Sequence, residues 1–246
     1  YMVDPETFES TLSDTDIKDD NIVKYKYGGL KAQLGKSEKT DQLNYAVGFD
    51  YNDETTEGER ILDNKQSIET IAIFGSLNYK ILEDYEIQPS ARYTYNSSYG
   101  SLFSPALNLK ASVNNNNTLR FSYARGFRAP SIKELFLDFH ISAGPFTYII
   151  SGNEDLEVEE SHSINLYYTF RKELKNESSL TLEPSLFYND IENLIALSEM
   201  VDFNRHYINI DEFKSLGGKL DASYKFNKAV TLRAGVSLIG RYNKFN

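Results

Sequence analysis

Apolar and polar residues alternate with a period of two through most of this chain. In 219–226 (KLDASYKF) every even-numbered residue is apolar and every odd-numbered residue is polar, and 164–171 (INLYYTFR) and 230–238 (VTLRAGVSL) divide in nearly the same way. Successive side chains of a β-strand point to opposite faces, so this pattern predicts strands rather than helices. One apolar and one polar face per strand indicates an antiparallel sheet that is wetted on one side.

About ten segments carry this pattern. We expect strands at 22–35, 41–51, 66–80, 85–97, 103–113, 117–126, 162–173, 179–197, 207–226 and 229–242. Short polar turns are expected at 36–40, 82–84, 114–116, 174–178 and 227–228, and the other connections are mostly longer, at 52–65, 127–162 and 198–206. Short turns at one end and long loops at the other are typical of outer-membrane barrels. Stretches as long as 207–226 also exceed the five or six residues usual in soluble strands.

The composition limits the number of domains and the fold classes that this chain can form. The chain has 246 residues and no Pro/Gly/Ser-rich linker, so we expect one domain over 1–246. It contains 18 tyrosines and 15 phenylalanines but no tryptophan, which suits the aromatic girdles of a barrel, although a soluble β-sandwich would be rich in aromatic residues too. The chain has no run of about 18 apolar residues, which argues against a transmembrane helix. No signal-peptide pattern is visible, so we expect such a segment to have been removed or to lie outside this sequence.

Charge and cysteine content exclude several classes of function. The chain has no cysteine, which rules out disulfides, thiolate metal sites and a cysteine nucleophile. Its net charge is -10 and no basic stripe stands out, so nucleic-acid binding is not expected. Acidic clusters at 14–20, 53–63 and 154–160 fall between the predicted strands and are interpreted as solvated loops. Calcium sites are the alternative, but the spacing matches no EF-hand loop.

Two short motifs flank the longest predicted loop. Residues 127–130 read Phe-Arg-Ala-Pro at the exit of one strand, and residues 152–156 read Gly-Asn-Glu-Asp-Leu before the next. This pair resembles two boxes of the β-barrel of TonB-dependent outer-membrane receptors. The second box departs at Glu154, where the family has proline. A further resemblance lies in 187–195 (FYNDIENLI) and in the residues Tyr207, Asn209 and Gly218, so that the likeness extends over 107–246.

The resemblance implies an all-β fold, an antiparallel transmembrane β-barrel. Barrels of this family have about 22 strands and an N-terminal plug domain. Only about ten strands are visible here and no plug-like α/β segment precedes them, so we expect part of a barrel without its plug. A part-barrel has two unpaired edges, which cannot lie in lipid. We therefore expect either that other pieces close the barrel or that the sheet is open and curved.

No enzyme site stands out in the sequence. The histidines at 140, 162 and 206 form no His-Glu-x-x-His pattern or three-ligand set, and no Gly-x-Ser-x-Gly elbow is present. We expect neither catalysis nor a resident cofactor.

The candidate ligand-binding residues lie in the loop 127–161. In haem-transporting members of the family a histidine between the boxes ligates the iron, so the resemblance makes His140 a candidate haem ligand; a solvated loop histidine is the alternative. Arg128 and Glu134 either gate the ligand at the base of the loop or are structural, with Arg128 tying a loop carboxylate by a bidentate pair. The aromatic residues of this loop form either a landing surface for a flat ligand or the loop's own small core. They are Phe136, Phe139, Phe146 and Tyr148.

The resemblance implies a receptor in the outer membrane of a Gram-negative bacterium. Such a receptor imports a scarce small molecule, namely haem, cobalamin or a ferric siderophore. Its expected partners are outer-membrane lipid and, through an N-terminal segment absent from this chain, the TonB complex. Two alternatives stay open. One is a passive porin or adhesin-like barrel, and the other is a soluble β-sandwich, whose two sheets would turn their apolar faces toward each other.

Overall fold

Long antiparallel strands make up almost all of the computed structural model, which describes residues 23–38, 42–143 and 145–244. The acidic cluster at 14–20, the first residues of the first two predicted strands, and part of the predicted turn at 36–40 lie outside these ranges. The strands are β1 (Lys24–Lys36), β2 (Leu43–Glu57), β3 (Lys65–Leu82), β4 (Tyr85–Asn96), β5 (Gly100–Asn114), β6 (Asn117–Arg128), β7 (Asp138–Ala143), β8 (Phe146–Ser151), β9 (Glu159–Glu173), β10 (Ser179–Leu197), β11 (Asn204–Lys225) and β12 (Thr231–Lys244).

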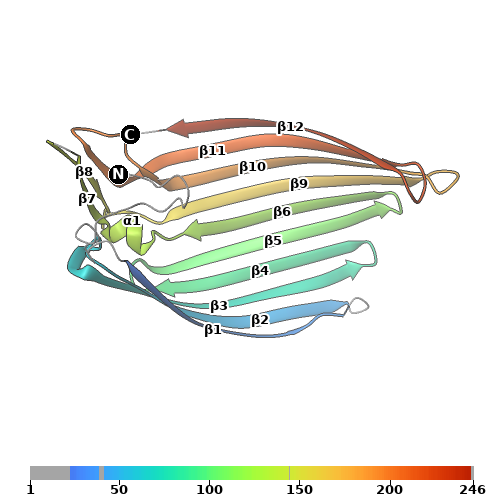
Figure 1. Ribbon diagram of the computed structural model, residues 1–246. Helices are drawn as coiled ribbons and strands as arrows, with labels where there is room; N and C mark the ends of the chain where they lie inside the picture. The colour runs from blue at the N-terminus through green and yellow to red at the C-terminus, as the bar shows by residue number, and fades with distance from the viewer. Residues whose placement is uncertain (1–22, 39–41, 144, 245–246) are drawn as a thin grey trace, which may run out of the picture.

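The strands form one 12-stranded sheet in which sequence neighbours usually pair. The order is β1 to β6, then β9 to β12, and every pair in this series is antiparallel. The short strands β7 and β8 form a hairpin, and β8 pairs in parallel with the start of β11. Figure 1 shows the short turns at one end of the sheet and the longer connections at the other, as predicted.

Register places the apolar residues of neighbouring strands side by side. Phe49 pairs with Ile73, Ile73 with Tyr93, and Tyr93 with Phe103, so that one apolar row crosses four strands. The residues next to them in sequence, such as Asp50 and Arg92, belong to the opposite face and form an ion pair there. The alternation seen in the sequence is therefore used consistently across the sheet.

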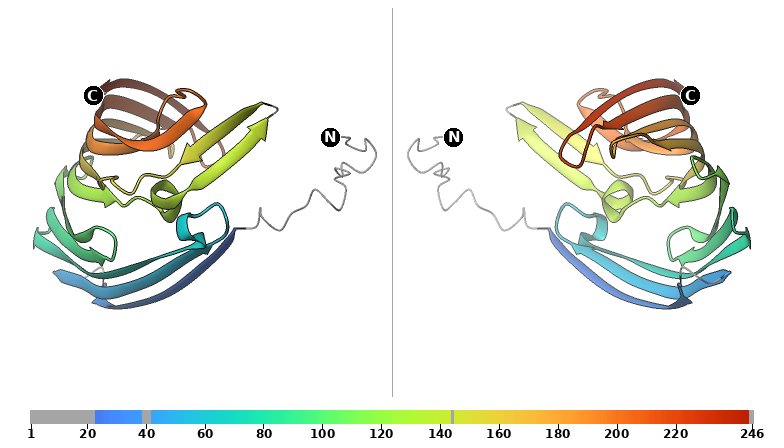
Figure 2. Two further views of the ribbon diagram at one scale, coloured as in Figure 1. Left: turned by 90° about the vertical axis from the view of Figure 1, so that its left-hand side faces the viewer. Right: turned by 90° about the vertical axis from the view of Figure 1, so that its right-hand side faces the viewer.

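The sheet is curved (Figure 2), and the face that carries the ion pair between Asp50 and Arg92 lies on the inside of the curve, the same face as Ile68 and helix α1 (Ile132–Phe136). Helix α1 lies within the curve and packs on Ile68 of the inner face. The apolar residues of the outer face remain uncovered, to the extent that Leu238 is 82% exposed. Within the described residues the sheet is open, with β1 and β12 at its edges, and no second sheet covers the apolar face. The soluble β-sandwich alternative is therefore wrong.

The outer face carries an apolar band bordered by tyrosines. Along β3 the band runs from Ile71 to Tyr79, which corresponds to about 26 Å of strand at about 3.3 Å per residue. Tyr51 and Tyr95 flank Ile71 near the long connections, and Tyr85 lies near the short turns. An apolar band between aromatic girdles is the arrangement expected of a barrel in a bilayer.

Three connections differ from the sequence-based expectation. Strand β2 continues to Glu57 and strand β11 begins at Asn204, so the loops predicted at 52–65 and 198–206 are shorter than expected. Pairing with long neighbouring strands extends these ends beyond the apolar alternation. The predicted loop 127–162 is not irregular either, because it contains α1 and the hairpin β7–β8. Across the described ranges, no helix is long and apolar enough to span a membrane.

Gly48 leaves room for the ring of Phe74 on the inner face of the sheet. A Cβ atom at Gly48 would lie against the ring of Phe74 and 2.8 Å from the carbonyl oxygen of Ala32. We expect Gly48→Ala to lower the free energy of unfolding by about 1–3 kcal/mol, because the ring and the backbone must both move. Gly75→Ala is the matched control, since its Cβ would come no nearer than 3.6 Å to the atoms around it. Urea unfolding of both variants in detergent checks this, and equal losses would contradict it.

Candidate functional site at the loop end of the sheet

The first box leads directly into helix α1. The hydroxyl of Ser131 accepts a hydrogen bond from the backbone N–H of Glu134 at 3.3 Å, and a carboxylate oxygen of Glu134 accepts one from the N–H of Ser131 at 2.8 Å. This reciprocal capping box starts the helix immediately after Pro130. The box sequence therefore ends one strand and begins the helix that turns into the curve of the sheet.

A small apolar core holds α1 against the inner face. Its buried members come from α1, from the second box and from two strands of the sheet, and they are Ile68, Ile132, Leu135, Leu156 and Ile195. Phe136 packs against this cluster and is partly buried. For Phe136 the structure thus favours the alternative in which the aromatic residue belongs to the loop's own core.

Arg128 joins the first box to two carboxylates. Its Nε and Nη2 donate to the two carboxylate oxygens of Glu159 at 2.8 and 2.6 Å, and its Nη1 donates to both oxygens of Glu134 at 3.1 and 2.9 Å. Glu159 is only 9% exposed and also accepts from the backbone N–H of Ile195 at 2.7 Å. One guanidinium therefore connects β6, α1, β9 and β10. These contacts agree with the structural interpretation of Arg128.

The electrostatics of this network follow from these contacts. The hydrogen bonds from Arg128 to Glu159 raise the pKa of Arg128. Partial burial acts to lower this pKa, and the hydrogen bonds to Glu134 raise it further. Burial acts to raise the pKa of Glu134, but the hydrogen bonds from Arg128 and from the backbone and hydroxyl of Ser131 outweigh it. The pKa of Glu134 is therefore lowered, and its carboxylate is ionised at neutral pH.

The second box is fixed to β11 by asparagine side chains. The side-chain amide of Asn153 donates to the carbonyl oxygen of Tyr207 at 3.0 Å. The backbone N–H of Asn153 donates to the carbonyl oxygen of Glu134 at 2.9 Å. The side-chain oxygen of Asn209 accepts from the N–H of Glu157 at 2.8 Å, and its amide group donates to the carbonyl oxygens of Glu157 and Asn193. These side chains satisfy backbone groups that have no strand partner.

Gly152 is required by close packing. A Cβ atom there would lie 2.5 Å from the carbonyl carbon of Leu135 and 2.6 Å from the backbone nitrogen of Phe136. The first residue of the second box therefore lies directly against the end of α1. Any larger residue would push the two boxes apart.

The hairpin β7–β8 presents aromatic side chains on one face. Phe139 lies under the guanidinium of Arg60, whose Cζ is 4.2 Å from the ring centroid. The rings of Phe146 and Tyr148 contact Phe203 of the β10–β11 connection, with centroids 4.9 and 5.2 Å apart. Register places Phe139, Phe146 and Tyr148 on the same face of the hairpin. The four aromatic residues predicted as one cluster thus separate into Phe136 in the core and three on the hairpin.

His140 lies on the other face of this hairpin. Its side chain is 52% exposed, and Nε2 lies 2.8 Å from a carboxylate oxygen of Asp138. Because neighbouring residues of a strand point to opposite sides, His140 and Phe139 do not share a surface. A flat ligand stacked on Tyr148 would therefore lie on the face of the hairpin away from His140.

Two clefts open at this end of the sheet. One, of about 380 Å³, is lined mostly by apolar side chains that include Ile61, Leu137 and Phe139, with Arg60 and Lys133 among its lining residues. The other, of about 320 Å³, lies beside the first box and is more polar, with Glu54, Arg92 and Tyr99 in its lining. Burial and the charge of Glu54 raise the pKa of Tyr99 to about 12. Tyr99 thus remains a neutral hydrogen-bond donor, and it donates to the carbonyl oxygen of Pro130.

No group of three or more histidine, aspartate or glutamate side chains within the described ranges could hold a metal ion. The cleft beside Phe139 is lined mostly by apolar and aromatic residues with two cationic ones, which suits an organic ligand with an apolar body.

Comparison with known proteins identifies the family. A model of the TonB dependent receptor-like, beta-barrel family matches residues 4–245. The chain belongs to this family. The predicted resemblance to these receptors is thus confirmed, and the match extends from the predicted 107–246 to nearly the whole chain. The all-β antiparallel fold agrees with this assignment.

The relatives of this receptor barrel are considerably longer. The ferrienterobactin receptor of Escherichia coli is 26% identical over 112 residues, which are 43% of this chain and 15% of that protein. The hemoglobin and hemoglobin-haptoglobin-binding protein C of Haemophilus influenzae is 36% identical over 95 residues, or 38% of this chain and 8% of that protein. The siderophore receptor PirA from Pseudomonas aeruginosa has the same fold, with a TM-score of 0.79 at 18% identity, over 90% of this chain and 44% of its own. The chain thus spans less than half of each.

Sequence analysis missed several residues of this site. Glu159 was interpreted as part of a solvated acidic cluster at 154–160, but it is buried and paired with Arg128. The cluster at 53–63 is likewise partly ordered, since Glu57 lies in β2 and pairs with Lys26 and Lys65. Both corrections have the same cause: a carboxylate at a strand end can reach a basic side chain on a neighbouring strand. Arg60 and Phe203 carry no local signal, because they meet the hairpin only in the folded structure.

We expect Arg128→Ala to loosen the loop 129–158. The change leaves Glu159 buried without its partner, which costs about 2 kcal/mol. Arg125→Ala is the control, because Arg125 also pairs with a glutamate, Glu160, but on the other face of the sheet. Hydrogen exchange of the loop amides, followed by mass spectrometry, should increase for Arg128→Ala alone. Unchanged exchange in that variant would show that the network does not order the loop.

The lowered pKa of Glu134 predicts that the loop loosens in acid. Ionised Glu134 stabilises the loop above the carboxyl's ordinary pKa of 4.5, and this stabilisation is lost as the pH falls through the lower folded-state value. Pepsin cleavage of the loop should therefore accelerate in that acidic range. Glu134→Gln should remove this pH dependence, whereas Glu154→Gln should keep it. A profile shared by all three proteins would contradict the assignment.

Proposed function

We propose that the chain is part of an outer-membrane receptor of a Gram-negative bacterium. The receptor imports a scarce ligand, namely haem, cobalamin or a ferric siderophore, with energy supplied through the TonB complex. The observation that carries the proposal is the ordered loop end, where the two boxes hold α1 and the aromatic hairpin over the inner face. Membership of the TonB dependent receptor-like, beta-barrel family also supports the proposal.

An iron-bearing ligand has the strongest support among these. One relative is named a receptor for ferrienterobactin and another is named a hemoglobin-binding protein. The aromatic face of the hairpin and the cleft that contains Arg60 and Lys133 offer an apolar surface beside positive charge. Such a surface suits an aromatic ligand that carries carboxylate or other anionic groups.

A passive porin is less consistent with this loop end. Helix α1 and its apolar core lie inside the curve of the sheet at its loop end (Figure 2), where a passive channel would need open space. The outward apolar band suits contact with membrane lipid.

Uptake by the full-length receptor tests the proposed function. We expect cells that express it to accumulate ferric enterobactin, haemin or cobalamin only when the TonB complex is intact. Tyr148→Ala should raise the half-saturation concentration about tenfold, equivalent to about 1.4 kcal/mol, through loss of an aromatic contact. Tyr45→Ala, on the lipid-facing side, is the control. Uptake without the TonB complex would support a porin instead.

Haem as the imported ligand has a specific test at His140. Haemin titrated into the full-length receptor in detergent should shift the Soret band, and His140→Ala should abolish the shift if a ring nitrogen of His140 ligates the iron. If Nε2 is the nitrogen that binds the iron, its contact with Asp138 has to break first. His206→Ala is the control, since His206 is another exposed histidine at this end of the sheet. A wild-type receptor without a shift would contradict the haem interpretation and favour a siderophore or cobalamin.

A further inference from the structure

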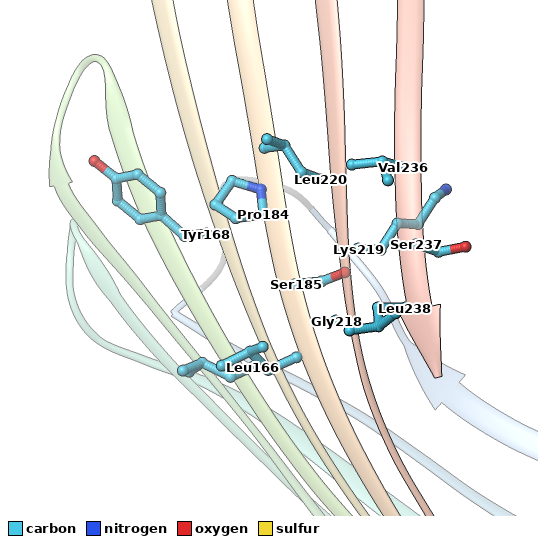
Figure 3. Close-up of a pocket in the computed structure, with 11 residues that line it drawn as sticks. Leu166, Tyr168, Pro184, Ser185, Gly218, Lys219, Leu220, Val236, Ser237 and Leu238 are labelled. Carbon is cyan, nitrogen blue, oxygen red and sulfur yellow. The ribbon is translucent and has the colours of Figure 1, made fainter. Parts of the chain in front are cut away.

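A groove interrupts the outer apolar face near the last strands of the sheet (Figure 3). It has a volume of about 470 Å³ and crosses β9, β10, β11 and β12. Gly218 lies at its centre, where register sets it between Leu186 and Leu238. Leu166, Leu220 and Val236 complete its apolar walls. The groove is thus formed because one position in an apolar row has no side chain.

The strand pairing beside the groove is also irregular. The ladder between β9 and β10 runs up to Leu182 and resumes at Ser185, and the gap contains Pro184, which has no N–H to donate. Pro184 and Tyr168 form the end of the groove nearer the short turns. The hydroxyl of Tyr168 donates to the side chain of Asn117, which marks the polar border of the apolar band at this end.

A cation lies beyond that border on the same face. Lys172 follows Tyr168 by four residues, about 13 Å along β9, and therefore points to the same side of the sheet. Lys172 is exposed, and it forms no ion pair with any residue in the described part of the chain. Arg171, its neighbour in sequence, points to the inner face and pairs with Glu173.

We infer that this groove binds one acyl chain of an anionic phospholipid, with the headgroup phosphate at Lys172. This inference rests on the proposed location in the outer membrane. The groove is continuous with the apolar band that would contact lipid, and its walls are exposed hydrocarbon, with Leu186 58% and Val236 67% exposed. A docking site for a protein would be expected to have a polar rim. The polar residues among those that line this groove, Ser185, Lys219 and Ser237, alternate with its apolar residues and therefore point to the opposite face of the sheet. Lys172 lies where the headgroup phosphate would lie when the acyl chain of the lipid fills the groove.

Native mass spectrometry of the full-length receptor tests this inference. After extraction in mild detergent and addition of phosphatidylglycerol, the wild type should retain one lipid more than Gly218→Leu, whose side chain fills the groove. A Cβ atom at position 218 comes within 3.1 Å of only the flexible end of Leu186, so the variant is expected to fold. Gly75→Leu is the control, because it makes the same change on the same face away from the groove.

The charge contribution is tested separately. Lys172→Ala should weaken phosphatidylglycerol binding about fivefold, and Arg171→Ala should leave it unchanged. Equal lipid retention by wild type and Gly218→Leu would overturn the inference. A receptor dimer that is lost in Gly218→Leu, without retained lipid, would also overturn it and assign the groove to a second copy. Ligand uptake by Gly218→Leu should stay normal, so loss of lipid and loss of the proposed function are distinguishable.

Discussion

Each long strand must place its apolar residues on the same face as those of its neighbours, because a shift of one residue would turn the whole set to the other side. The row from Phe49 to Phe103 shows this register carried across four strands. With the apolar rows on the outside of the curve, the inner face is left to polar side chains such as Asp50 and Arg92. This common register of the strands determines where the loop end, the groove at Gly218 and the tyrosine border lie.

The loop end adds a second, local constraint. Arg128 is the last residue of β6 and forms an ion pair with Glu159, the first residue of the adjacent β9. The pair therefore joins the two ends of the loop between β6 and β9. Between them, the cap of α1 and the asparagines at 153 and 209 fix an otherwise irregular segment. The hairpin with Phe139 and Tyr148 is thereby presented at the mouth of the curve. The loop is thus held at its base by an ion pair, a helix cap and side-chain hydrogen bonds.

The sequence predicted the strands of the sheet and their two faces, because alternation records directly which side of a strand is apolar. It also located both boxes and predicted that Arg128 ties a loop carboxylate, but not which one. It could not predict that Phe136 and His140 would separate, since one belongs to a helix and the other to a strand inside what looked like a loop. It also missed the burial of Glu159, because a carboxylate in an acidic run has no local sign of a distant partner.

The orientation of the apolar face is tested most directly by spin labels placed one at a time along β3, from Ile71 to Tyr79, in the full-length receptor in bilayers. The chain itself has no cysteine to interfere. Odd-numbered positions should be accessible to dissolved oxygen from the lipid, and even-numbered positions such as Ala72 should be protected from it. Equal protection of both sets, or oxygen access at the even-numbered positions alone, would contradict a sheet that turns its apolar face to the membrane.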